Sequence, residues 1–164
     1  VMNKLIIWLS AAIICLGFTA CNDDNTENDA ALTQQLIGSW HLISENDKST
    51  NMLAYTFRAQ EFIYSTSVTT ENGMKAQTMT ISGAWNVQKG ILQLNYDLES
   101  LHCEGYTASE EKQIYDGFYK ENLLLQDMNN RKEPYGPTVT FSTQGNQETL
   151  TLSNIPGAFT RRTF

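Results

Sequence analysis

The sequence has few of the residues on which enzymes usually depend. It contains two histidines and three cysteines, and it shows no zinc-ligand spacing, phosphate-binding loop or serine elbow. Basic residues are also scarce, because 11 Lys and Arg stand against 18 Asp and Glu and give a net charge of −7. Nucleic acid attracts proteins mainly through basic side chains, so it is not an expected partner. We expect a non-enzymatic protein without catalytic residues, metal ligands or a cofactor.

The two histidines offer one hypothesis for catalysis. His102 stands directly before Cys103, and a thiol next to an imidazole is the basis of a cysteine–histidine dyad. Neighbouring side chains on an extended chain point to opposite faces, however, so this pair would not meet. His41 alternates with Trp40 and is expected to face solvent. Neither histidine therefore indicates an active site.

Long apolar runs are absent apart from one near the N-terminus. Residues 5–18 are mostly apolar, and this run is shorter than the roughly 20 residues that a membrane-spanning helix needs. With Lys4 before it and small residues after it, the run is typical of an export signal. Phe18-Thr19-Ala20-Cys21 then resembles the lipobox of bacterial lipoproteins, although that family usually has Leu, Val or Ile at the position of Phe18.

The lipobox resemblance implies that residues 1–20 are a removed signal peptide and that Cys21 carries acyl chains. More than one chain would anchor the protein stably in a membrane, since each buried methylene contributes about 0.8 kcal/mol. The alternative is an ordinary cleaved signal followed by a chance cysteine. Cys103 would remain as the single free thiol after removal of the signal and lipidation.

Residues 21–30 form an acidic segment with four acids and no base. This segment resembles the signal that sends lipoproteins of some Gram-negative anaerobes to the cell surface. The alternative interpretation is a flexible, solvated tether, because like charges with little apolar surface do not pack. We expect a lipid-anchored protein of the outer membrane that is exposed on the cell surface, with a periplasm-facing anchor as the alternative.

Residues 31–164 are predicted to form one domain, in which apolar and polar residues alternate. After a short helical turn at residues 31–37, a period of two is typical of half-buried strands. The alternating segments are residues 40–42, 53–57, 62–68, 78–87, 92–96, 139–142, 149–153 and 159–161. Asn72-Gly73, Lys89-Gly90 and Gln144-Gly145 mark turns between them. The pattern predicts an all-β fold of about eight antiparallel strands in a meander that closes into a barrel, since closure removes free edges.

One helical insert is expected between the fifth and sixth strands, from Thr107 to Asn130. Thr107 and Glu110 have the spacing of a capping box, which satisfies free amides at a helix start. Ile114 and Phe118 follow at helical spacing. The helix is predicted to lie across one open end of the barrel and to bury these two residues, either as a plug that completes the core or as a lid over a cavity.

Gly38-Ser39-Trp40 resembles the Gly-x-Trp signature of lipocalin-like domains, and Gly83-Ala84-Trp85 repeats it. In that family the tryptophan fills the closed end of the barrel, and a basic residue near the C-terminus packs over it. The resemblance implies that Gly38, Trp40 and Arg161 (or Arg162 in its place) close this barrel. Lipocalins usually carry their helix after the last barrel strand, so the insert is a departure from the family.

The resemblance also implies that the barrel binds a small apolar ligand inside or at its mouth. Inward-facing aromatic residues are the candidates for this contact, and buried tyrosine hydroxyls need partners that a ligand can supply. The candidate ligand-binding residues are Tyr55, Phe57, Tyr64, Trp85 and Tyr96. The alternative is a filled barrel in a non-catalytic accessory lipoprotein that binds another component of the envelope.

Overall fold

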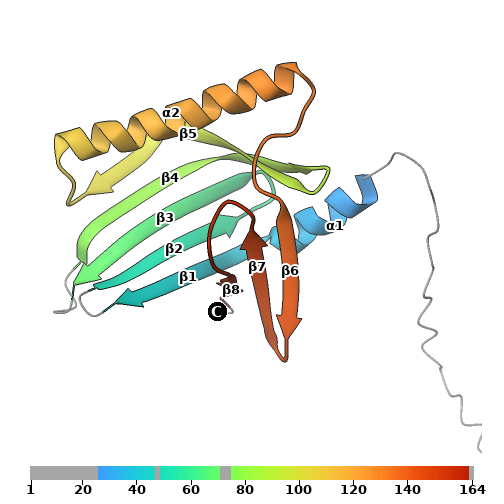
Figure 1. Ribbon diagram of the computed structural model, residues 1–164, viewed down its shortest axis with the longest axis horizontal. Coiled ribbons are helices and arrows are strands. Elements are labelled where there is room, and N and C mark those ends of the chain that lie inside the picture. Colours follow the sequence, from blue (N-terminus) through green and yellow to red (C-terminus); the bar gives the residue numbers. More distant parts are fainter. Residues whose placement is uncertain (1–25, 47–48, 71–74, 163–164) are drawn as a thin grey trace, which may run out of the picture.

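The structure is a computed structural model that describes residues 26–46, 49–70 and 75–162. The predicted signal peptide and the lipidated Cys21 lie outside these residues. The described chain forms one eight-stranded antiparallel sheet with two helices (Figure 1). In chain order the elements are α1 (Thr26–Leu36), β1 (Gly38–Asn46), β2 (Ser49–Phe57), β3 (Glu61–Thr70), β4 (Lys75–Gln88), β5 (Ile91–Glu104), α2 (Ala108–Asn130), β6 (Val139–Gln144), β7 (Gln147–Leu152) and β8 (Phe159–Arg161).

Apart from β5 and β6, strands that follow each other in the sequence are also neighbours in the sheet, whose order is β5-β4-β3-β2-β1-β8-β7-β6. One meander contains β1 to β5 and a second contains β6 to β8. They are joined where β8 pairs with β1, with Arg161 opposite Trp40. The predicted class, a largely antiparallel β fold with about eight strands, is confirmed.

The predicted closure into a barrel is not seen, because the outer strands β5 and β6 meet at one point only. An isolated bridge pairs Ile91 with Thr138, and the Leu92 amide donates to the Pro137 carbonyl at 2.9 Å. Beyond this point no pairing joins β5 to β6 within the described residues. The sheet is therefore open along most of this line (Figure 1).

Helix α2 explains why β5 stays unpaired with β6. The helix runs beside β5 (Figure 1), and the Asn122 side chain forms hydrogen bonds with the backbone amide and carbonyl of Tyr96 at the strand edge. The Tyr96 amide donates to Asn122 Oδ1 at 2.9 Å, and Asn122 Nδ2 donates to the Tyr96 carbonyl at 2.7 Å. The helix thus covers an edge that another strand would otherwise pair with. It lies along the sheet edge instead of across an end, and Ile114 and Phe118 are half-buried.

The start of α2 follows the sequence prediction. The Thr107 amide donates to Glu110 Oε2 at 2.7 Å, and the Glu110 amide donates to Thr107 Oγ1 at 3.4 Å, which is the predicted capping box.

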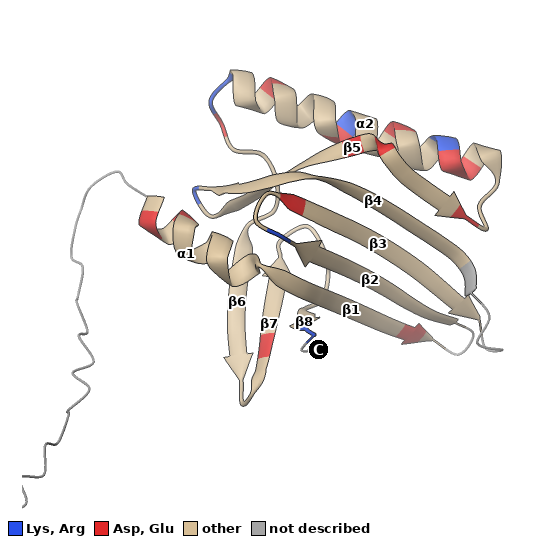
Figure 2. Ribbon diagram, turned by 180° about the vertical axis from the view of Figure 1, so that it is seen from behind, with Lys and Arg blue, Asp and Glu red and all other residues tan. Residues whose placement is uncertain are grey.

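Figure 2 shows that many of the acidic and basic residues lie on α2. The middle of β1 to β4 carries no charged residue, so this part of the sheet presents uncharged faces.

Helix α1 begins at Thr26, which is earlier than the helical turn expected at residues 31–37 and lies inside the segment assigned to the tether. Both oxygens of Asp29 accept from the turn between β4 and β5, at 2.7 Å from the Lys89 amide and 2.8 Å from the Gly90 amide. Lys89 and Gly90 have φ values of 54° and 74°, as a two-residue hairpin turn requires. Asp29 therefore attaches α1 to the sheet.

Candidate functional site

Gly38, Trp40 and Arg161 meet where α1 leads into β1. Trp40 is fully buried, and the Arg161 guanidinium carbon lies 4.4 Å from the centroid of its ring. Arg161 Nη1 also donates to the Ile37 carbonyl at 2.8 Å. A Cβ atom at residue 38 would lie 2.8 Å from this nitrogen, so glycine makes room for the guanidinium. The three residues are thus in contact through Arg161, and their role in closing a barrel stays a prediction.

Three of the five candidate ligand-binding residues, Tyr55, Phe57 and Trp85, belong to the packed core, and two of these three line neither cavity described below. Phe57 is 1% exposed and Trp85 is 8% exposed, and their rings meet edge to face with centroids 5.0 Å apart. Trp85 Nε1 donates to the Arg58 carbonyl at 2.8 Å, which satisfies the indole. Neither residue lines the cavities described next, so their positions give no support to a role in ligand binding.

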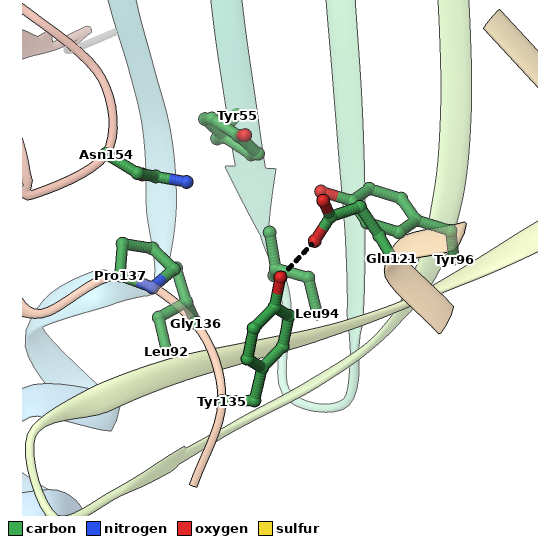
Figure 3. A pocket seen from close by; sticks show the side chains of 9 residues that line it. All are labelled: Tyr55, Leu92, Leu94, Tyr96, Glu121, Tyr135, Gly136, Pro137 and Asn154. Atoms are coloured by element: carbon green, nitrogen blue, oxygen red, sulfur yellow. Dashed lines mark hydrogen bonds between the residues drawn. The ribbon is translucent and has the colours of Figure 1, made fainter. Parts of the chain in front are cut away.

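The three tyrosine candidates line two adjoining cavities that share Tyr55, Tyr96 and Glu121. The larger, here called the tyrosine cavity, has a volume of about 410 Å³. Its lining residues are Tyr55, Leu92, Leu94, Tyr96, Glu121, Tyr135, Gly136, Pro137 and Asn154 (Figure 3). The smaller cavity, of about 350 Å³, lies under α2 and includes Tyr64 and Phe118. Both volumes fall within the usual range of about 300–1,000 Å³ for small-molecule sites.

The three tyrosines form one aromatic group. The rings of Tyr55 and Tyr64 stack with centroids 4.7 Å apart, and Phe118 of α2 lies 4.6 Å from Tyr96. Burial is the main cause that raises the pKa of Tyr55, Tyr64 and Tyr96 above the ordinary value. Nearby tyrosines, including Tyr106 beside Tyr64, add to it, and so does the Glu121 carboxylate at Tyr96. All three hydroxyls are therefore neutral at physiological pH and keep their protons, and the side chains of Tyr55 and Tyr96 are hydrogen-bonded to each other.

The cavity contains three polar residues that the sequence reasoning did not identify, namely Glu121, Tyr135 and Asn154. The Tyr135 hydroxyl donates to Glu121 Oε2 at 3.1 Å (Figure 3), and burial together with this carboxylate raises the pKa of Tyr135. Glu121 follows Phe118 by three positions, so helical spacing was a usable signal for it. Tyr135 and Asn154 lie in connections between elements, where no periodicity marks an inward side chain.

The histidines and Cys103 lie apart from this cavity. His102 Nε2 is 3.2 Å from Glu104 Oε1. Burial and the nearby Glu111 raise the pKa of the Cys103 thiol, which disfavours the thiolate that nucleophilic chemistry requires. Burial and Arg162 lower the pKa of His41. In the described part of the chain, no group of three His, Cys, Asp or Glu residues is placed to hold a metal ion.

Comparison with known proteins adds no identification, since no family model, no curated protein and no solved structure matches the chain. Neither α1 nor α2 combines the length and apolar character needed to cross a membrane, and the search for such helices covered the described residues. The tyrosine cavity is therefore the feature of the molecule that bears on function.

Proposed function

We propose that this protein binds a small ligand with an apolar body in the tyrosine cavity. The observation that carries the proposal is a cavity of about 410 Å³ in which apolar side chains and neutral hydroxyls face the same space. Apolar walls contribute affinity through surface removed from water, and a few hydrogen-bonding groups fix the orientation of a ligand. We infer no catalytic role, since a binding function accounts for this arrangement.

We further propose that the fold is a lipocalin-like barrel whose closure is incomplete. The strand order is the cyclic order of an up-and-down barrel, with one gap between β5 and β6. The contact of Arg161 with Trp40, and the close approach of the Arg161 guanidinium to Gly38, support the same interpretation. The tyrosine cavity lies where this gap begins, because it is lined by Leu92 and Pro137, whose backbones are hydrogen-bonded, and by Leu94 further along β5. A ligand would enter there.

The proposed location is the outer membrane, through acyl chains on Cys21, with the domain on the cell surface. Five peptide units join Cys21 to the start of α1 at Thr26, and they span at most about 18 Å. Such a short connection would hold the start of α1 close to the lipid surface. Cys21→Ser should move the protein from the membrane fraction to the soluble fraction, whereas Cys103→Ser should leave it on the membrane.

The ligand function is tested by titrating the purified protein with the apolar fluorescent probe N-phenyl-1-naphthylamine. We expect saturable binding to one site, and displacement of the probe by material extracted from cells into organic solvent. Absence of saturable binding would contradict the proposal. Co-purification of a membrane protein in that case would favour the alternative, an accessory lipoprotein with a filled interior.

A further inference from the structure

Glu121 is the charged residue of the ligand site. It lines both the tyrosine cavity and the smaller cavity under α2, and the other described residues that line them are uncharged. Glu121 lies at the exposed side of the site, whereas Tyr55 is 4% exposed and lies deep within it. A ligand that fills the cavity would therefore place one end against the hydroxyl of Tyr55 and the other near a carboxylate.

The Glu121 carboxylate keeps acceptor capacity for a ligand. An ionised carboxylate has about four lone-pair sites, and the Tyr135 hydroxyl occupies one of them at 3.1 Å. Within the described residues no lysine, arginine or histidine forms an ion pair with Glu121. The carboxylate is thus held in position by a neutral donor and is not neutralised by a cation of the protein (Figure 3).

The rings around this carboxylate favour a positive charge as well. Tyr55, Tyr96 and Tyr135 line the tyrosine cavity together with Glu121. Aromatic rings attract cations through the negative charge of their faces, and a carboxylate nearby adds direct attraction. An anionic ligand would meet repulsion from Glu121. The net charge of −7 adds a long-range attraction for cations over the whole chain.

From this arrangement we infer that the ligand is a small amine, with an apolar body inside the tyrosine cavity and a protonated nitrogen paired with Glu121. The inference rests on the proposed ligand-binding function and specifies the chemical class of the ligand. The ammonium group donates one hydrogen bond to Glu121, and the hydroxyl oxygens of Tyr96 and Tyr135 can accept its other hydrogen bonds. The apolar body replaces water beside Leu92, Leu94 and Pro137.

Three probes with the same ring and different charge test this inference. They are 1-naphthylmethylamine, 1-naphthalenemethanol and 1-naphthylacetic acid, which are cationic, neutral and anionic near neutral pH. We expect the amine to bind the wild-type protein about tenfold more tightly than the alcohol, and the acid to bind most weakly. Added salt should weaken the binding of the amine and leave the binding of the alcohol nearly unchanged.

Glu121→Gln should weaken amine binding about tenfold and bring the ratio of amine to alcohol affinity close to one. Glu111→Gln is the matched control, because it removes the same charge from the same helix at a residue that lines neither cavity. It should keep the preference for the amine. Urea unfolding of both variants verifies that they fold.

Two outcomes would overturn the inference in different ways. If the alcohol or the acid binds the wild-type protein as tightly as the amine, or if Glu121→Gln keeps the preference, the amine assignment is wrong while ligand binding itself stands. If none of the three probes binds and N-phenyl-1-naphthylamine also fails to bind, the proposed function is wrong and the inference falls with it.

Discussion

The guanidinium group of Arg161 lies over the indole ring of Trp40, with its central carbon 4.4 Å from the ring centroid. The same guanidinium donates to the backbone carbonyls of Gln35 and Ile37. Arg161 is in the last strand, and Trp40 is in the first. One side chain therefore joins the end of the domain to its beginning and holds the second meander against the first.

Arg161→Ala should lower the free energy of unfolding by about 2–3 kcal/mol, because it removes a stacked cation and hydrogen bonds from a charged donor. Arg161→Lys should lower it by more than about 1 kcal/mol, since lysine lacks the planar fork. Urea unfolding measures both effects. Arg131→Ala removes an exposed ion pair with Asp127 and should change stability by less than about 0.5 kcal/mol. Equal losses at the two sites would contradict this role of Arg161.

The same substitution should have opposite effects at two glycines. A Cβ atom at Gly83 would lie 2.1 Å from the Asn95 carbonyl oxygen and 2.8 Å from the Phe62 ring, so Gly83→Ala should cost about 3 kcal/mol. At Gly117, inside α2, no atom lies within 4 Å of the added carbon apart from the neighbouring residues and the backbone of the helix itself. Gly117→Ala should therefore stabilise the protein by about 0.5–1 kcal/mol. Thermal or urea unfolding decides the sign, and a loss at Gly117 would contradict the packing described for α2.

Asp29→Asn should loosen the contact between α1 and the hairpin turn. The carboxylate accepts from two amides, Lys89 and Gly90, and the amide that replaces it has one oxygen to offer. We expect a loss of about 1–2 kcal/mol in the free energy of unfolding and faster hydrogen exchange at these two amides. Glu27→Gln, in the same turn of α1, is the control and should leave their exchange rates unchanged.

Stability should fall when the pH rises above about 10. Burial raises the pKa of Tyr55, Tyr64 and Tyr96, whereas tyrosine in the unfolded chain loses its proton near pH 10. The unfolded state then binds fewer protons than the folded state, so the free energy of unfolding declines with pH, by up to about 1.4 kcal/mol per pH unit for each tyrosine. Below that pH the contribution is fully present.

Urea unfolding at about pH 8 and about pH 11 measures this decline. Tyr64→Phe removes one of the three titrating hydroxyls and should make the decline less steep. A free energy of unfolding that is the same at both pH values would contradict the burial of the three tyrosines.

Local signals made the elements predictable from the sequence. The capping box at Thr107 and Glu110 depends on residues three positions apart, and the hairpin turn at Lys89-Gly90 depends on two adjacent residues. Each feature is therefore determined by residues that are close together in the sequence. Barrel closure is different, because it depends on what covers the edge of β5. Asn122, which follows Tyr96 by 26 positions, covers that edge from α2, and no periodicity reveals such a contact.

The candidate site was predictable only where its residues lie on strands. Alternation places Tyr55 and Phe57 on the same face of β2, and the structure confirms that both are buried. Both residues belong to the core, and alternation does not tell how far along the strand the cavity extends, so it does not separate Tyr55, which lines the cavity, from Phe57, which does not. Glu121, Tyr135 and Asn154 reach the cavity from a helix and two connections, which strand periodicity cannot identify.

The most direct test of ligand binding in the tyrosine cavity compares two tryptophan variants in the titration with N-phenyl-1-naphthylamine. Asn154→Trp adds a large side chain at the exposed side of the cavity, and Thr151→Trp adds the same side chain at an exposed position of β7 that does not line it. We predict that the wild-type protein and Thr151→Trp bind the probe alike, and that Asn154→Trp binds it at least about tenfold more weakly. Equal binding by all three proteins, or no binding by the wild-type protein, would contradict a ligand site in this cavity.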